Sequence, residues 1–86
     1  MRFKEIIIPY DVAVKIACVH RVARKEVLMG LRLGYPRFFN AANGKTLIIV
    51  SYPRYLTIIA VLKKEALFVI TAYPSSRWQK NRYRKK

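Results

Sequence analysis

The first part of the chain combines one strand-like run with two helical patterns. An apolar run over 3–8 predicts a strand. Apolar residues at helical spacing then predict a helix over 12–20, for which Asp11 is the expected N-cap. The apolar stripe of this helix comprises Val12, Ile16 and Val19. A second helix is expected over 24–33, with its apolar residues facing the core and Gly34 ending it.

Beyond the second helix the pattern changes to strands separated by turns. The expected strands are 38–42, 46–52, 55–62 and 66–72. Asn43-Gly44 favours a two-residue hairpin turn, because both residues tolerate positive φ. Continuous apolar runs such as 47–50 indicate strands that are covered on both faces, or nearly so. A turn over 73–76 leads into the basic segment 77–86, which we expect to be helical.

Together these elements predict one α+β domain that occupies residues 1–86. An N-terminal strand and two helices pack on a twisted antiparallel sheet of about four strands, and a short basic helix follows at the C-terminus. The hydrophobic fraction of 53% is ample for a core in a chain of 86 residues. A chain of this size buries about 60% of its unfolded surface.

Charge is the most unusual property of the composition. The chain has 18 Lys and Arg against 4 Asp and Glu, a formal net charge of +14. Solubility requires only a few excess charges, so this excess favours an anionic partner. Nucleic acid is the leading class, ahead of an acidic protein or an anionic membrane surface. With a single cysteine, no signal peptide and no apolar stretch of membrane-spanning length, we expect a cytoplasmic protein without a membrane partner.

The ionisable residues restrict the chemistry that the chain can perform. Its few scattered carboxylates do not predict the clustered acidic site of a two-metal nuclease, and one His with one Cys does not predict a zinc site. No Gly-rich phosphate loop occurs, so we expect neither a metal nor a cofactor. RNA cleavage remains feasible, because the 2′-hydroxyl is an internal nucleophile and the protein need only position it, move protons and stabilise charge.

The candidate catalytic residues lie at the end of the first helix and in the C-terminal segment. Histidine titrates near neutrality, which makes His20 the candidate general acid or base. Arg77 and Arg82 are the candidate phosphate clamps, and Tyr73 or Tyr83 is the auxiliary proton donor. The residues expected to contact nucleic acid are Arg21, Arg24, Lys25, Ser75, Ser76, Trp78, Lys80 and Arg84.

Each of these residues also has a structural explanation. A lone histidine at a helix end often stabilises that end rather than a reaction, which applies to His20. Trp78 and Tyr83 are equally suited to packing the tail against the sheet. The cations at 21, 24 and 25 are also compatible with a solvated helix face, and those at 84–86 with a frayed terminus.

Several segments, taken in order, resemble one protein family. They are 11–16 leading to His20, 25–28, a Gly44-Lys45 hairpin, a pair of apolar strands, 69–72, and a basic helix ending Arg82-Tyr83-Arg84. Over nearly the whole chain, this order is similar to the BrnT-like toxins of the RelE-type group of small bacterial and archaeal ribonucleases. The resemblance implies helices packed on a twisted antiparallel sheet, RNA cleavage without metal, and neutralisation by a smaller antitoxin.

The resemblance also assigns roles to individual residues. His20 matches the family's helix-end histidine, Thr71 and Ala72 match the pair that ends the last strand, and Arg82 and Tyr83 match the basic-Tyr pair of the final helix. The chain departs from the family where Tyr73 stands in place of an Arg, at Arg21 and Ala23, and in a final helix without a Glu.

We therefore expect a metal-independent endoribonuclease toxin of a type II toxin–antitoxin pair, which cleaves RNA by 2′-hydroxyl attack. Its implied partners are RNA, a cognate antitoxin, and DNA for the toxin–antitoxin complex. One alternative is a non-catalytic RNA- or DNA-binding module with the same fold, which the Tyr73 departure motivates. Another is a basic protein that docks an acidic partner.

Overall fold

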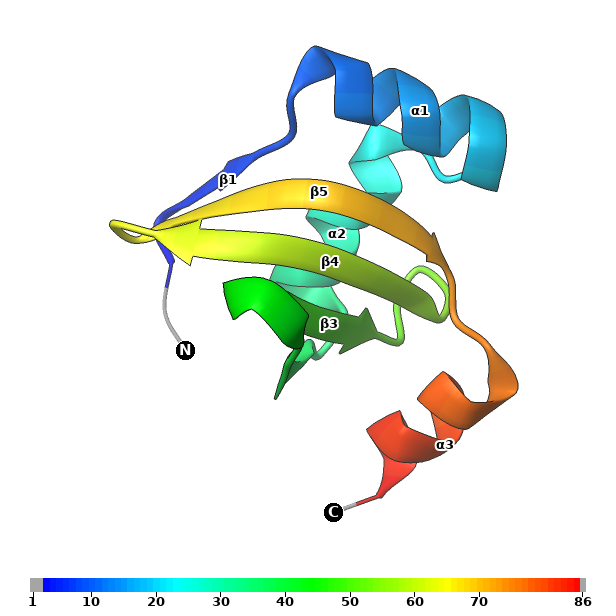
Figure 1. Cartoon of the computed structure of the whole chain (residues 1–86). Helices are drawn as coiled ribbons and strands as arrows, with labels where there is room; N and C mark the ends of the chain where they lie inside the picture. The colour runs from blue at the N-terminus through cyan, green and yellow to red at the C-terminus, as the bar shows by residue number, and fades with distance from the viewer. Residues whose placement is uncertain (1–2, 86) are drawn as a thin grey trace.

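The computed structural model describes residues 3–85 as a five-stranded sheet with three α-helices (Figure 1). The elements are β1 (Glu5–Ile7), α1 (Tyr10–His20), α2 (Arg24–Leu33), β2 (Arg37–Asn40), the 3₁₀ turn η1 (Ala42–Gly44), β3 (Thr46–Val50), β4 (Leu56–Lys63), β5 (Ala66–Pro74) and α3 (Arg77–Arg84). The predicted α+β class and the short basic C-terminal helix are therefore confirmed. Lys86, the last residue of the predicted basic segment, lies outside the described residues.

The four predicted antiparallel strands are present, and the N-terminal strand joins them as a fifth, parallel strand, so the sheet is mixed. Its strand order is β1-β5-β4-β3-β2. The neighbours from β5 to β2 are antiparallel, whereas β1 pairs in parallel with residues 66–68 of β5. This pairing joins strands about 60 residues apart in the sequence, so no local turn signal indicates it.

The first helix ends at His20 as predicted, but it begins two residues earlier than predicted. It begins at Tyr10, and Pro9 occupies the N-cap position without a side-chain hydrogen bond. Asp11 is instead a residue of the first turn, where its negative charge interacts favourably with the positive N-terminal end of the helix dipole. Val19 of the predicted apolar stripe is 65% exposed, whereas Val22, which follows the left-handed C-cap Arg21 (φ 57°), is fully buried in the core.

The second helix has the predicted bounds, and Gly34 is its C-cap. Val27 and Leu31 are buried against the sheet. A Cβ atom on Gly34 would lie 2.6 Å from the carbonyl oxygens of Gly30 and Tyr52. The end of α2 therefore approaches the backbone after β3 as closely as a glycine allows.

The strands and turns of the second half follow the prediction in outline. Asn43 (φ 62°) and Gly44 (φ 72°) have the predicted positive φ, but the connection spans residues 41–45 rather than two. Between the expected strands 55–62 and 66–72 the turn consists of residues 64 and 65, because Lys63 pairs with Ala66 as the last residue of β4. The predicted turn over 73–76 is wrong in its first half, since Tyr73 and Pro74 pair with Thr57 and Leu56 as the end of β5.

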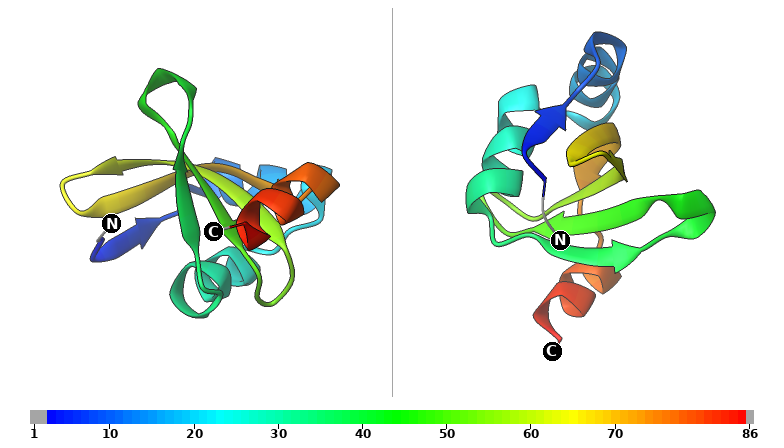
Figure 2. Two further views of the ribbon diagram at one scale, coloured as in Figure 1. Left: turned by 90° about the horizontal axis from the view of Figure 1, so that it is seen from below. Right: turned by 90° about the vertical axis from the view of Figure 1, so that its left-hand side faces the viewer.

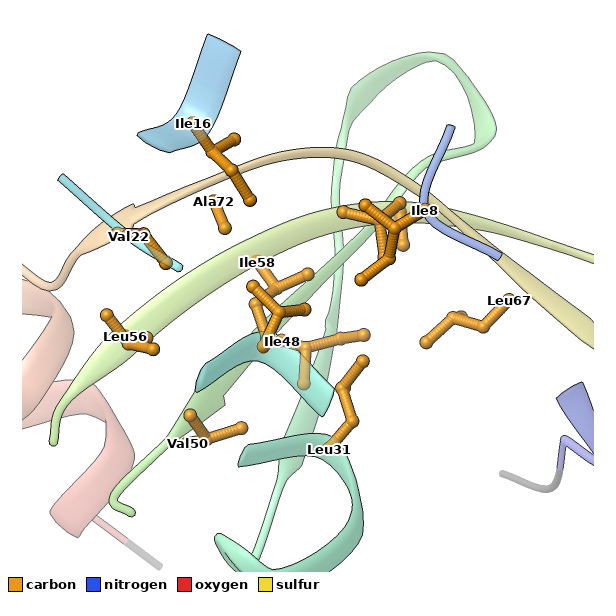
Figure 3. Close-up of a cluster of buried hydrophobic side chains, with 13 residues drawn as sticks. Ile8, Ile16, Val22, Leu31, Ile48, Val50, Leu56, Ile58, Leu67 and Ala72 are labelled. Atoms are coloured by element: carbon orange, nitrogen blue, oxygen red, sulfur yellow. The ribbon is translucent and has the colours of Figure 1, made fainter. Parts of the chain in front are cut away.

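Helices α1 and α2 cover one face of the sheet, and α3 lies against the other (Figure 2). Leu56 and Ile58 of β4 point into the core beneath α1 and α2 (Figure 3). Thr57 lies between them, so its side chain points to the opposite face, where it contacts Gln79 of α3. Among the described residues 3–85, no helix is long and apolar enough to cross a membrane.

Candidate functional site

A buried polar network fixes the first turn of α3 to the sheet. Gln79, only 3% exposed, accepts hydrogen bonds from the backbone N–H of Ser76 (2.9 Å) and the hydroxyl of Thr57 (2.9 Å). The Thr57 hydroxyl oxygen also lies 2.8 Å from that of Ser75. The amide nitrogen of Gln79 donates to the hydroxyl oxygen of Tyr73 at 3.2 Å. Tyr73 is thereby oriented by the helix that follows it.

A second set of contacts fixes the C-terminal end of α3. The Arg37 guanidinium donates to the backbone carbonyls of Tyr83 and Lys85, which are terminal helix groups without an intrahelical partner. The Tyr83 hydroxyl donates to the Tyr35 carbonyl at 2.7 Å, and its ring meets Tyr55 edge-on at 5.7 Å. Tyr83 thus packs the tail against the sheet, and its phenol proton is engaged in that packing.

His20 and Tyr73 are brought together from distant parts of the chain. His20 is the last residue of α1, and its ring lies 5.8 Å from that of Tyr73, measured between centroids, at a tilt of 52°. Because β1 pairs only with residues 66–68, it leaves the far end of β5 open, and α1 lies along this end (Figure 1). The Tyr73 oxygen accepts from Gln79, which leaves its O–H available to a ligand.

Arg82 lies at the other end of α3 from this pair. Its guanidinium carbon is 4.4 Å from the ring centroid of Phe39 on β2. Sheet order places β2 three strand spacings from β5, so the two rings that Arg82 and His20 contact are on the order of 14 Å apart. The structure therefore places Tyr73 against His20, while Arg82 and Tyr83 make their contacts elsewhere, with Phe39 and with Tyr35 and Tyr55.

The remaining cations of α3 have no acidic neighbour on the helix. Arg77 is exposed at its first position, and Lys80 and Arg84 lie 5.7 Å and 5.5 Å from the ring centroid of Tyr55. Trp78 is 57% exposed and so does little of the packing that was considered for it. In the described part of the chain, the two ion pairs are Lys4–Glu65 and Arg54–Glu26. The positive charge of α3 therefore faces solvent.

A second group of cations follows His20 at the α1–α2 junction. Arg21, Arg24 and Lys25 are all exposed. Arg54 holds this junction in place, since it donates to the Arg21 carbonyl at 2.7 Å and to the Glu26 carboxylate at 2.9 Å. The hydrogen bond from Arg54, together with one from the backbone of Ala23, lowers the pKa of Glu26. Positive charge thus flanks the His20–Tyr73 contact on both sides of β5.

Three residues that shape the site were not among the sequence candidates. Gln79 had a recognisable signal, because Ser76 followed three residues later by Gln79 is the capping-box pattern. Arg37 and Arg54 had none, since each bonds to a segment that is distant in the sequence. Their roles follow only from the tertiary structure.

Comparison with known proteins adds no family assignment. No protein-family model matches this chain, and no curated protein matches it significantly. Within residues 3–85, no group of three His, Cys, Asp or Glu side chains could hold a metal ion. The functional proposal therefore depends on the geometry of α1, β5 and α3.

Proposed function

We propose that this protein binds single-stranded RNA along α3 and cleaves it without a metal ion beside His20 and Tyr73. The observation that carries the proposal is the contact of the His20 ring with Tyr73, whose hydroxyl is bonded to Gln79 in the first turn of the basic helix. An acid–base pair thereby adjoins a cationic surface. The resemblance to BrnT-like toxins supports a role as a cytoplasmic toxin with a cognate antitoxin.

The proposed reaction is attack of a 2′-hydroxyl on the adjacent phosphate. His20 takes the proton of the 2′-hydroxyl as general base, and the Tyr73 hydroxyl gives its proton to the departing 5′-oxygen. The 2′-oxygen–phosphorus bond forms and the phosphorus–5′-oxygen bond breaks, which yields a 2′,3′-cyclic phosphate and a 5′-hydroxyl. Arg77 on α3 and Arg21 beside His20 supply positive charge for the phosphorane oxygens.

A non-catalytic RNA-binding module is the second candidate. One specific observation favours it. The hydroxyl of Tyr83, a residue that the family resemblance matches to the final helix of these ribonucleases, donates its hydrogen bond to the Tyr35 carbonyl. Arg82, the other such residue, stacks on Phe39 at the same end of α3. In this case α3 binds RNA electrostatically, and log K falls steeply with log salt while the RNA stays intact.

Digestion of end-labelled RNA in EDTA separates the two candidates. The wild type is expected to release 2′,3′-cyclic phosphate ends, and His20→Ala is expected to be at least about 100-fold slower. Tyr73→Phe removes only a hydroxyl, and Tyr10→Phe is its matched control, since Tyr10 is 85% exposed on α1. Equal cleavage by wild type, His20→Ala and Tyr73→Phe would remove the pair from the mechanism. Salt-dependent binding by a wild type that does not cleave would establish the second candidate.

A further inference from the structure

The outward face of α3 carries a groove of nucleotide size. Its volume is about 530 Å³, and its lining residues are Trp78, Asn81, Arg82 and Lys85. This spacing places all of them on one face of the helix, while Gln79 faces the sheet. Ligand sites of roughly 300–1,000 Å³ hold molecules of nucleotide size or larger.

The lining residues offer the three kinds of contact that an unpaired nucleotide accepts. The indole of Trp78, 57% exposed, presents an aromatic surface on which a base can stack. Asn81 is exposed and supplies an amide donor and an amide acceptor, which match the edge of a base. Arg82 and Lys85 supply positive charge for a phosphate.

The groove is held in place by contacts on its far side. The Arg82 guanidinium is supported by the Phe39 ring at 4.4 Å. The backbone of Lys85 is fixed at its carbonyl by Arg37, at 2.6 Å. Together with the Gln79 network at the first turn, these contacts pre-organise the helix face, which lowers the entropic cost of binding.

We infer that this groove binds one unpaired purine nucleotide of an RNA strand. The base stacks on Trp78, the Asn81 amide reads its edge, and Arg82 and Lys85 contact its phosphate. Adenine is the expected base, because an Asn side chain pairs with its N6 and N7 atoms through one acceptor and one donor. This inference rests on the proposed RNA-binding function and adds a base-selective site at a distance from the His20–Tyr73 pair.

Trp78 is the only tryptophan of the chain, so its fluorescence reports on this groove alone. The full chain is titrated at low salt with a short 2′-O-methyl oligoadenylate, which cannot be cleaved because its 2′-oxygen is blocked. Stacking is expected to quench the emission of Trp78 in a saturable way. A 2′-O-methyl strand of the same length without bases keeps the phosphates and is expected to bind without this quenching.

Trp78→Ala tests the energetic role of the stack. Its affinity for oligoadenylate, measured by anisotropy of a labelled strand, is expected to fall about 10-fold, while its affinity for the abasic strand stays unchanged. Tyr10→Ala is the matched control, because it also removes an exposed aromatic side chain, on α1. Circular dichroism verifies that both variants fold, as the exposure of the two side chains leads us to expect. Oligouridylate is expected to bind more weakly than oligoadenylate.

The outcomes distinguish failure of this site from failure of RNA binding itself. Oligoadenylate that binds without changing Trp78 emission, and with equal affinity for Trp78→Ala, overturns the nucleotide site but leaves the proposed function standing. Equal affinity for the abasic and adenine strands would likewise overturn the nucleotide site without affecting the proposed function. Absence of any RNA binding at low salt overturns both, and binding of an acidic peptide in its place would assign the cationic face of α3 to a protein partner.

Discussion

Gln79→Ala should detach the first turn of α3 from the sheet. Gln79 is 3% exposed, and its side chain makes hydrogen bonds to Thr57, Ser76 and Tyr73. At about 1 kcal/mol net for each bond, the loss is about 3 kcal/mol. Part of this cost comes from Thr57, which is fully buried and would be left with the Ser75 hydroxyl as its remaining partner.

This loss is large relative to the stability of a domain of this size. A chain of 86 residues typically has an unfolding free energy of about 4–13 kcal/mol. Each kcal/mol shifts the midpoint of thermal unfolding by about 4–8 °C in a domain of this length. Gln79→Ala is therefore expected to lower the midpoint by about 12–24 °C.

Thermal unfolding followed by circular dichroism measures this shift, with Asn81→Ala as the control. Asn81 carries the next shorter amide side chain on the same helix, but it is exposed. Its replacement by alanine is expected to change the midpoint by no more than a few degrees, because exposed substitutions stay within about 0.5 kcal/mol. If the two variants unfold at the same temperature, the Gln79 network does not hold α3, and the orientation of Tyr73 loses its explanation.

The end of α3, one ion pair and one close backbone approach give three further tests. Arg37→Leu removes the donor to the last carbonyls of α3 and should cost about 1 kcal/mol, with faster amide hydrogen exchange in the final turn as the measurement. The hydrogen bond from Arg54 lowers the pKa of Glu26 below its usual 4.5. The stabilisation of the folded state by this ion pair is therefore fully present above pH 4.5 and is lost as pH falls through the folded-state pKa. Over this pH range the free energy of unfolding of the wild type, measured in urea, should therefore fall by up to about 1 kcal/mol more than that of Glu26→Gln, and an equal pH dependence of the two would contradict this. In Gly34→Ala the new Cβ atom would lie 2.6 Å from two carbonyl oxygens, which should lower the free energy of unfolding by about 2–3 kcal/mol. The loss should exceed that of Gly44→Ala, whose new Cβ atom has no neighbour within 4 Å.

The parts of the fold with local signals could be predicted from the sequence. The bounds of α2 were correct because the helical spacing of its core residues and the position of Gly34 both predict the same end of the helix. The pairing of β1 with β5 was missed, since it joins segments that are far apart in the sequence and leaves no local signal. Tyr73 and Pro74 were assigned to a turn because proline usually ends a strand, yet Pro74 pairs with Leu56 as the last residue of β5.

The candidate site was predictable in its residue types but not in its arrangement. A lone histidine, tyrosines and a basic tail indicated the chemistry, and the structure places His20 against Tyr73. Which tyrosine meets His20 depends on how α1 lies along β5, and residue spacing does not determine this. Tyr83 matched the family pattern equally well, but its hydroxyl bonds to Tyr35 in the segment between α2 and β2.

Single-turnover cleavage in EDTA tests most directly whether α3 holds the RNA while His20 cleaves it. The rate at saturating protein and the concentration at half-saturation are measured for wild type, His20→Ala and Arg82→Ala. We expect His20→Ala to lower the rate at saturating protein by at least about 100-fold and to leave the half-saturation concentration unchanged. Arg82→Ala should raise the half-saturation concentration and keep the saturating rate, because its guanidinium lies at the other end of α3. A saturating rate that falls with Arg82→Ala and not with His20→Ala would contradict the account.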